Sequence, residues 1–77
     1  MASVTVYSTD SCPFCRKAEE YLEQQNVTFS VKKVDEDHDS AVEMVHKSGQ
    51  QGVPVLDIDG QIIVGFNKPE IDKALGL

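Results

Sequence analysis

The order of apolar and polar residues along this chain predicts strands and helices in turn. A continuous, β-branched run at 4–7 is typical of a buried strand. After a polar turn at 8–11, apolar residues recur at helical spacing, which predicts a helix that begins near Cys12 or Pro13 and stops near Asn26. The apolar positions expected along this helix and its exit are Phe14, Ala18, Tyr21, Leu22 and Val27.

The middle of the chain predicts a second strand and a second helix. Residues 27–34 alternate and are rich in strand formers, so we expect a strand there. An acidic loop at 35–39 follows. Residues 40–43, Ser-Ala-Val-Glu, fit a capping box. They predict a helix that opens there and runs to about Ser48, with Gly49 as its C-terminal stop.

The last third of the chain predicts a hairpin and a third helix. Residues 53–58 and 61–64 are expected to be strands, joined by Asp-Gly at 59–60, a strong hairpin signal. A turn at 65–67 leads to a helix that starts near 68–70. Its expected buried residues are Ile71, Ala74 and Leu75. Because a right-handed crossover makes the first two strands parallel, the order β-α-β-α-β-β-α predicts an α/β fold, a four-stranded mixed sheet flanked by three helices.

Composition limits the size of the fold and the classes of partner. With 77 residues, 40% of them hydrophobic, we expect one domain over 1–77 with a single core. The net charge of −6 argues against nucleic acid or an anionic membrane as a partner. No apolar run approaches the roughly 20 residues of a membrane span, and the first residues lack a signal-peptide pattern. We therefore expect a cytoplasmic protein, and a monomer.

Both cysteines lie in Cys12-Pro13-Phe14-Cys15, at the predicted junction of strand and helix. Cys-x-x-Cys at such a junction is a redox signature. Residues three apart share a helix face, so we expect the two sulfurs to lie within disulfide reach and their bridge to be easily reduced. The helix N-terminus favours Cys12 as the thiolate nucleophile. Cys15, one turn further in and more buried, is expected to resolve the mixed disulfide.

Two other interpretations of the cysteines carry less weight. Inert buried thiols seldom occur at x-x spacing at a strand–helix junction. A metal site would need further ligands, for which only His38 and His46 are candidates, and a zinc site usually has a second closely spaced ligand pair. We therefore expect no metal site.

The Cys-Pro-Phe-Cys motif, followed by Val53-Pro54 and then Gly65, resembles the glutaredoxins over essentially the whole chain. The resemblance implies a thioredoxin fold and thiol–disulfide exchange, with no tightly bound cofactor and with glutathione as a co-substrate. It implies that Pro54 is a cis proline facing the cysteines, beside which the Val53 backbone pairs with substrate. It also implies a binding groove. The expected lining residues are Pro13, Phe14, Val53, Pro54, Gly65, Phe66 and Asn67. For Phe14, packing in the core is an alternative.

Three positions depart from the glutaredoxin pattern. Thr9 stands where a lysine is frequent, and Gly52 precedes Val53-Pro54 where threonine is usual. The segment 65–68 reads Gly-Phe-Asn-Lys in place of the Gly-Gly-(Cys/Ser)-Asp that grips glutathione. Donors for the carboxylates of glutathione are therefore partly missing. The 65–66 pair, followed by a proline and an acid, is also similar to NrdH-type redoxins.

The leading prediction is a dithiol oxidoreductase that reduces protein or glutathione mixed disulfides through Cys12 and Cys15. The alternative is an NrdH-type redoxin, which takes electrons from thioredoxin reductase and supplies ribonucleotide reductase. A carrier of a glutathione-bridged iron–sulfur cluster and a redox-sensing binding module are further alternatives. The expected partners are glutathione or thioredoxin reductase, together with disulfide-containing proteins.

Overall fold

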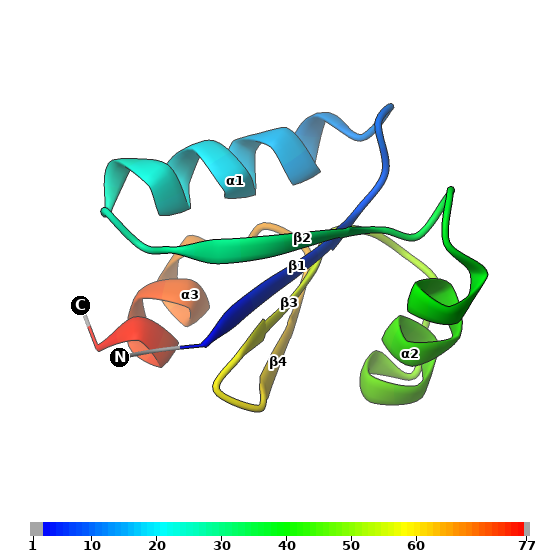
Figure 1. Cartoon of the computed structure of the whole chain (residues 1–77). Helices are drawn as coiled ribbons and strands as arrows, with labels where there is room; N and C mark the ends of the chain where they lie inside the picture. The colour runs from blue at the N-terminus through cyan, green and yellow to red at the C-terminus, as the bar shows by residue number, and fades with distance from the viewer. Residues whose placement is uncertain (1–2, 77) are drawn as a thin grey trace.

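The computed structural model describes residues 3–76 and contains a four-stranded mixed sheet with three helices (Figure 1). This confirms the predicted α/β fold and the predicted order of elements. The elements in chain order are β1 (Val4–Ser8), α1 (Pro13–Gln24), β2 (Phe29–Lys33), α2 (His38–Ser48), β3 (Val55–Ile58), β4 (Gln61–Val64) and α3 (Lys68–Leu75). The longest helix in this part of the chain has 12 residues, which is too short to cross a bilayer.

The sheet has the order β2-β1-β3-β4, so β1 is an inner strand with a partner on each side. β1 and β2 are parallel, with Val4 opposite Phe29, as the right-handed crossover predicts. β3 is antiparallel to both β1 and β4. The turn between β3 and β4 has positive φ angles of 52° at Asp59 and 90° at Gly60, which confirms the predicted hairpin.

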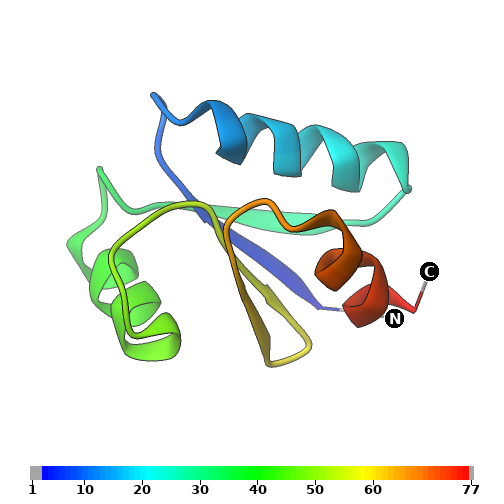
Figure 2. The same ribbon diagram turned by 180° about the vertical axis from the view of Figure 1, so that it is seen from behind.

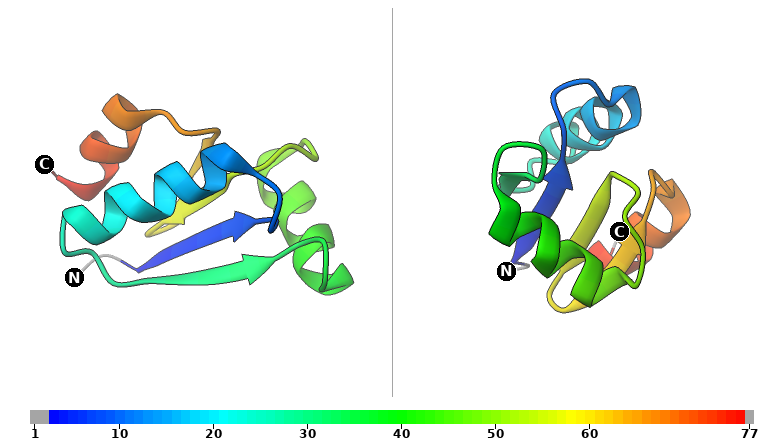
Figure 3. Two further views of the ribbon diagram at one scale, coloured as in Figure 1. Left: turned by 90° about the horizontal axis from the view of Figure 1, so that it is seen from above. Right: turned by 90° about the vertical axis from the view of Figure 1, so that its right-hand side faces the viewer.

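Helices lie on both sides of the sheet (Figure 3), and each face has its own apolar cluster. On one face, α1 and α3 pack through Leu22 and Ile71 against Val6 of β1 and Leu56 of β3. On the other face, α2 packs mainly through Met44, which joins the smaller cluster. Because successive residues of a strand point to opposite faces, β1 supplies side chains to both clusters. This central strand leads directly to the loop that carries the first cysteine.

The start of α2 corrects the predicted capping box. The helix begins at His38 with Asp37 as its N-cap, whereas the sequence pattern favoured an opening at Ser40. The Asp37 carboxylate accepts the N–H of Asp39 at 3.2 Å and the hydroxyl of Ser40 at 2.7 Å. A turn immediately after β2 causes the shift, because the N–H of Asp37 donates to the carbonyl of Lys33 at 3.0 Å. The helix therefore starts as soon as the strand has ended.

Two strands are shorter than predicted. β2 begins at Phe29 and not at Val27, because the N–H of Val27 donates to the carbonyl of Leu22 at 3.0 Å and still belongs to the exit of α1. β3 begins at Val55, one residue after Pro54, which has no N–H to offer a neighbouring strand.

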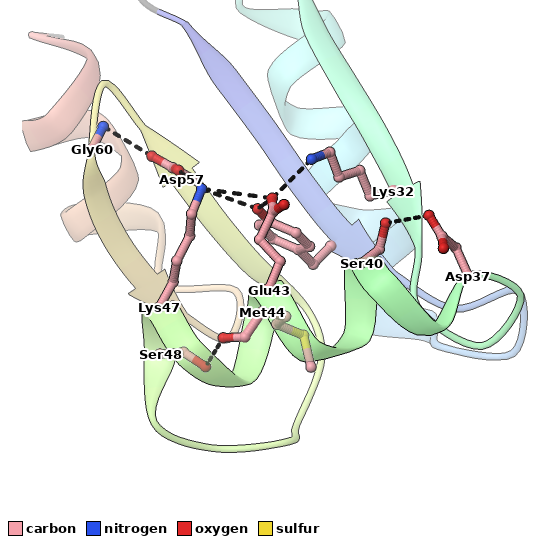
Figure 4. Close-up of polar contacts among 10 residues, drawn as sticks. Lys32, Asp37, Ser40, Glu43, Met44, Lys47, Ser48, Asp57 and Gly60 are labelled. Carbon is pink, nitrogen blue, oxygen red and sulfur yellow. Dashed lines mark hydrogen bonds and ion pairs between the residues drawn. The ribbon is translucent and has the colours of Figure 1, made fainter.

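A polar cluster joins α2 to the sheet beside Met44 (Figure 4). Glu43 accepts hydrogen bonds from the Tyr7 hydroxyl and, at 2.8 Å, from Lys32. Lys47 contacts Asp57 at 2.6 Å and the Tyr7 hydroxyl at 3.2 Å. Burial, together with Glu43, raises the pKa of the Tyr7 hydroxyl, so this buried group stays protonated and can donate. The cluster therefore ties α2 to β1, β2 and β3.

The charge on Glu43 makes these contacts between α2 and the sheet sensitive to acid. The hydrogen bond from Lys32, and after it the one from Tyr7, lowers the pKa of the Glu43 carboxyl from 4.5 to about 2. A carboxylate whose pKa is lower in the folded state stabilises the fold above its unfolded pKa. That stabilisation is lost as the pH falls from about 4.5 through about 2.

We expect Glu43→Gln to lower the free energy of unfolding near neutral pH by about 1 kcal/mol or less, because solvent screens ion pairs of a side chain that is 39% exposed. The difference between the two proteins in the free energy of unfolding should become smaller as the pH falls towards 2, because Glu43 of the wild type then loses its charge. Urea unfolding across an acid pH series measures it. Glu23→Gln on α1 is the matched control and should show no such trend. A Glu43→Gln difference that is constant with pH would contradict the assignment.

Candidate active site

Cys12 lies at the N-cap of α1, where the loop after β1 turns into the helix. Its backbone is extended, with φ −96° and ψ 109°, and Pro13 follows as the first helical residue. The N–H of Cys15 donates to the sulfur of Cys12 at 3.2 Å. The sulfur of Cys12 therefore takes the place of a capping oxygen, at the end of the helix where backbone N–H groups point outwards.

Cys15 lies one turn into α1 and is only 1% exposed, as the sequence predicted, whereas Cys12 is half-buried. Both cysteines are free thiols in this structure. Burial, and after it the hydrogen bond with Cys12, raises the pKa of the Cys15 thiol to about 12. Cys15 is therefore a neutral thiol near neutral pH.

The segment before β3 lies against the Cys12 sulfur. The Cys12 thiol faces the carbonyl oxygen of Val53 at 3.8 Å. The peptide bond between Val53 and Pro54 is cis, as the resemblance implied. Gly65, with a φ of 82°, donates its N–H to the carbonyl of Pro54 at 2.8 Å. Residues far apart in sequence thus meet at one end of the sheet (Figure 2).

Phe14 is not a core residue of α1. Its side chain is 57% exposed, and the ammonium of Lys17 lies 5.3 Å from the centre of its ring. The helical spacing predicted burial for Phe14 equally with Ala18, yet only Ala18 faces the sheet. The exposed ring is compatible with a binding role beside Cys12, which stays a prediction.

Phe66 and Asn67 have structural roles that the sequence did not reveal. The ring of Phe66 packs edge-on against that of Tyr21, with 6.0 Å between centroids. Asn67 is the N-cap of α3 and accepts the N–H of Glu70 at 3.4 Å. Phe66 therefore joins the segment before α3 to α1, and Asn67 caps the start of α3, while their role in substrate binding stays a prediction.

Charged side chains surround Cys12. Two hollows of about 420 and 370 Å³ share Cys12 in their walls, together with Asp10, Arg16 and Glu20. Asp10 forms an ion pair with Lys33 of β2, and this pair lowers the pKa of the Asp10 carboxyl through the hydrogen bond from Lys33. Sequence reasoning missed this pair, because no local pattern relates residues so far apart in the chain.

Within residues 3–76, no three side chains of His, Cys, Asp or Glu come together as a metal-binding group. The expected absence of a metal stays a prediction. The chemically distinctive groups of this part of the chain are the two thiols. Their geometry allows one sulfur to meet a substrate while the other waits behind it.

Comparison with known proteins agrees with this fold and shows the family. The glutaredoxin family model matches residues 4–63. A glutaredoxin-like 8.6 kDa protein in the rubredoxin operon of Clostridium pasteurianum is 50% identical over 72 residues, which cover 94% of this chain and 96% of that protein. Glutaredoxin 3 of Escherichia coli K12 is 35% identical over 65 residues, covering 84% and 78%. The crystal structure of a glutaredoxin from Archaeoglobus fulgidus superimposes with a TM-score of 0.86 at 25% identity, covering 97% and 87%. This chain, with its thioredoxin-like fold and its adjacent cysteines, therefore belongs to the glutaredoxin family.

Proposed function

We propose that this protein is a thiol–disulfide oxidoreductase that reduces disulfides, including those of proteins, with Cys12 as nucleophile and Cys15 as resolving thiol. The observation that carries the proposal is the contrast between the two sulfurs. Cys12 is accessible and accepts a backbone N–H at the helix N-terminus, a position that favours negative charge on sulfur. Cys15 lies directly behind it and is buried.

The proposed cycle transfers two electrons to the substrate. The Cys12 thiolate attacks one sulfur of the substrate disulfide, and the other substrate sulfur leaves as a thiolate that takes up a proton. Cys15 then loses its proton and attacks the sulfur of Cys12. This releases the second substrate thiol and leaves Cys12 and Cys15 joined as a disulfide. A reductant must return two electrons to this disulfide before the next cycle.

The protonation of Cys15 orders these steps. With a pKa of about 12, the Cys15 thiol does not compete with Cys12 for the substrate. Part of that shift comes from the hydrogen bond with Cys12. This contribution is lost once Cys12 is bound in a mixed disulfide, so the pKa of Cys15 falls after the first step, although burial, the larger cause, still raises it.

We expect iodoacetamide at neutral pH to label Cys12 and to leave Cys15 largely unmodified, because alkylation needs an accessible thiolate. Peptide mapping by mass spectrometry locates the label. The control is the same protein in concentrated guanidinium, where both cysteines should react. Equal labelling of the two sites in the folded protein would contradict the assignment of roles.

We expect Cys15→Ser to carry out the first step and then accumulate a mixed disulfide on Cys12, because the resolving sulfur is missing. Cys12→Ser should show no adduct. Intact-mass spectrometry after addition of bis(2-hydroxyethyl) disulfide measures both variants. As much adduct on Cys12→Ser as on Cys15→Ser would show that the nucleophile is a different group.

Glutathione and a flavoprotein of the thioredoxin reductase type are the two candidate electron donors. The start of α3 favours the flavoprotein. Asn67 already accepts the N–H of Glu70, and Lys68 contacts Asp72 at 3.3 Å. Glu70 adds negative charge to the same turn. Cations and free N–H groups for the carboxylates of glutathione are therefore scarce at the start of α3. Thr9, in the loop before Cys12, is uncharged and adds no cation either.

We expect thioredoxin reductase with NADPH to reduce the oxidised protein faster than glutathione with glutathione reductase and NADPH. Loss of NADPH absorbance under anaerobic conditions measures both reactions, and Cys12→Ser is the blank. Thr9→Lys supplies a cation and should raise the glutathione rate about fivefold, the effect of an exposed charge pair, without raising the rate with thioredoxin reductase. A faster rate with the glutathione system than with thioredoxin reductase would reject the flavoprotein as the preferred donor.

A further inference from the structure

An open groove of about 770 Å³ lies on the side of α2 that faces away from the polar cluster. It is larger than either hollow at Cys12 and falls within the usual size of a binding cleft. Val42 and Val45 are 54% and 36% exposed there, although both lie on a helix that packs against the sheet. The apolar residues that line the groove are Val34, Ala41, Val42, Met44 and Val45.

The groove adjoins the site of thiol chemistry. Thr9 lines the groove and also one of the two hollows at Cys12. Gln51 lines the groove two residues before Val53, whose carbonyl oxygen lies 3.8 Å from the Cys12 sulfur. The loop after β1, the start of α2 and the segment after α2 lie at one end of the molecule in both opposed views (Figures 1 and 2). A chain bound in the groove can therefore extend to Cys12.

The rim of the groove is acidic at one end. Asp35 lines it, and two further exposed acids lie close in sequence: Glu36 in the same loop and Asp39 in the first turn of α2. The nearest lysines of β2 are engaged elsewhere, since Lys32 pairs with Glu43 and Lys33 with Asp10.

Two histidines also line the groove. His38, at the start of α2, and His46, in its last turn, belong to the lining together with Asp35. With the acids at one end, the groove suits a ligand that combines an apolar side chain with a cation.

We propose that this groove binds an extended segment of a disulfide-bearing protein, in which a large apolar residue and a lysine or arginine lie close in sequence to the cysteine that Cys12 attacks. This rests on the proposed function and names its substrate class. The apolar side chain would cover Val42 and Val45, and the cation would pair with Asp35. A second copy of this chain fits poorly, because two molecules with a net charge of −6 would bring acidic rims together.

The groove also distinguishes protein substrates from glutathione. Glutathione has no large apolar side chain, so it gains no binding free energy from the exposed methyl groups of Val42 and Val45. A protein segment with leucine at the right spacing buries apolar area that small disulfides lack. The expected result is selectivity for protein disulfides, provided by residues outside the two cysteines.

The test uses short peptides whose cysteine is capped with thionitrobenzoate, so that attack by Cys12 releases a coloured thiol. One series carries leucine and lysine at increasing distances from the cysteine, and its partner series carries serine and glutamine at the same positions. The thionitrobenzoate disulfide of 2-mercaptoethanol is the small reference substrate. We expect the best leucine–lysine peptide to react about tenfold faster than its partner at low concentration, the gain from burying most of one large apolar side chain.

Substitutions locate the effect in the groove. Val42→Asn should remove most of the preference for leucine, and Asp35→Asn most of the preference for lysine. Val64→Asn on β4 and Asp59→Asn in the hairpin are the matched controls, and both should keep the wild-type preferences. All four variants should react with the reference substrate at the wild-type rate, which shows that they are folded.

The outcomes separate this proposal from the one on which it rests. Loss of reaction with the reference substrate in the wild type would overturn the proposed function itself. A normal reference rate, with leucine–lysine and serine–glutamine peptides equal at every spacing, would overturn only the groove assignment. A preference lost equally in Val64→Asn and Val42→Asn would also overturn it. So would a dimer in sedimentation experiments that Val42→Asn dissociates.

Discussion

The contact between the Cys15 N–H and the Cys12 sulfur, at 3.2 Å, is the interaction on which the candidate site depends. It places one sulfur at the positive end of α1 and, by the spacing of a helical turn, the other directly behind it. The first turn of α1 thereby makes the two cysteines chemically different. Cys12 faces the Val53 carbonyl and the hollows at the surface, whereas Cys15 is enclosed between the helix and the sheet. The proposed dithiol cycle uses the accessible sulfur for the first attack and the buried sulfur to release the substrate.

The sheet supports the loop that carries Cys12. β1 is bonded on both sides and buried on both faces, so the loop that leaves its end is anchored by the most protected strand of the fold. α1 and α3 cover one face of the sheet. α2 is held to the other face by Met44 and by the polar cluster around Glu43, which leaves its opposite side open to solvent. The proposed docking groove therefore lies on a helix that is firmly fixed relative to the cysteines.

Membership of the glutaredoxin family accounts for the scaffold, and a few side chains account for the surroundings of the sulfur. Thr9 replaces a frequent lysine, and Asn67 uses its side chain to cap α3. Phe66 packs against Tyr21 and contributes its ring to the core near α3. Thr9 and Asn67 thus set which charges and donors a substrate would meet near these elements. The electron donor and the protein substrate are therefore proposed from local chemistry, not from the fold.

The sequence by itself determined the features whose cause is local. A proline after Cys12 starts a helix, a buried β-branched run forms the central strand, and Asp59 with Gly60 closes a hairpin, because neighbouring residues alone restrict the backbone there. The tertiary structure decided which face each helix presents and which distant groups meet. It left Phe14 exposed, paired Asp10 with Lys33 and brought the Val53 carbonyl to Cys12. Those outcomes depend on how the elements pack in space, and periodicity along the chain carries no information about distances between residues remote in sequence.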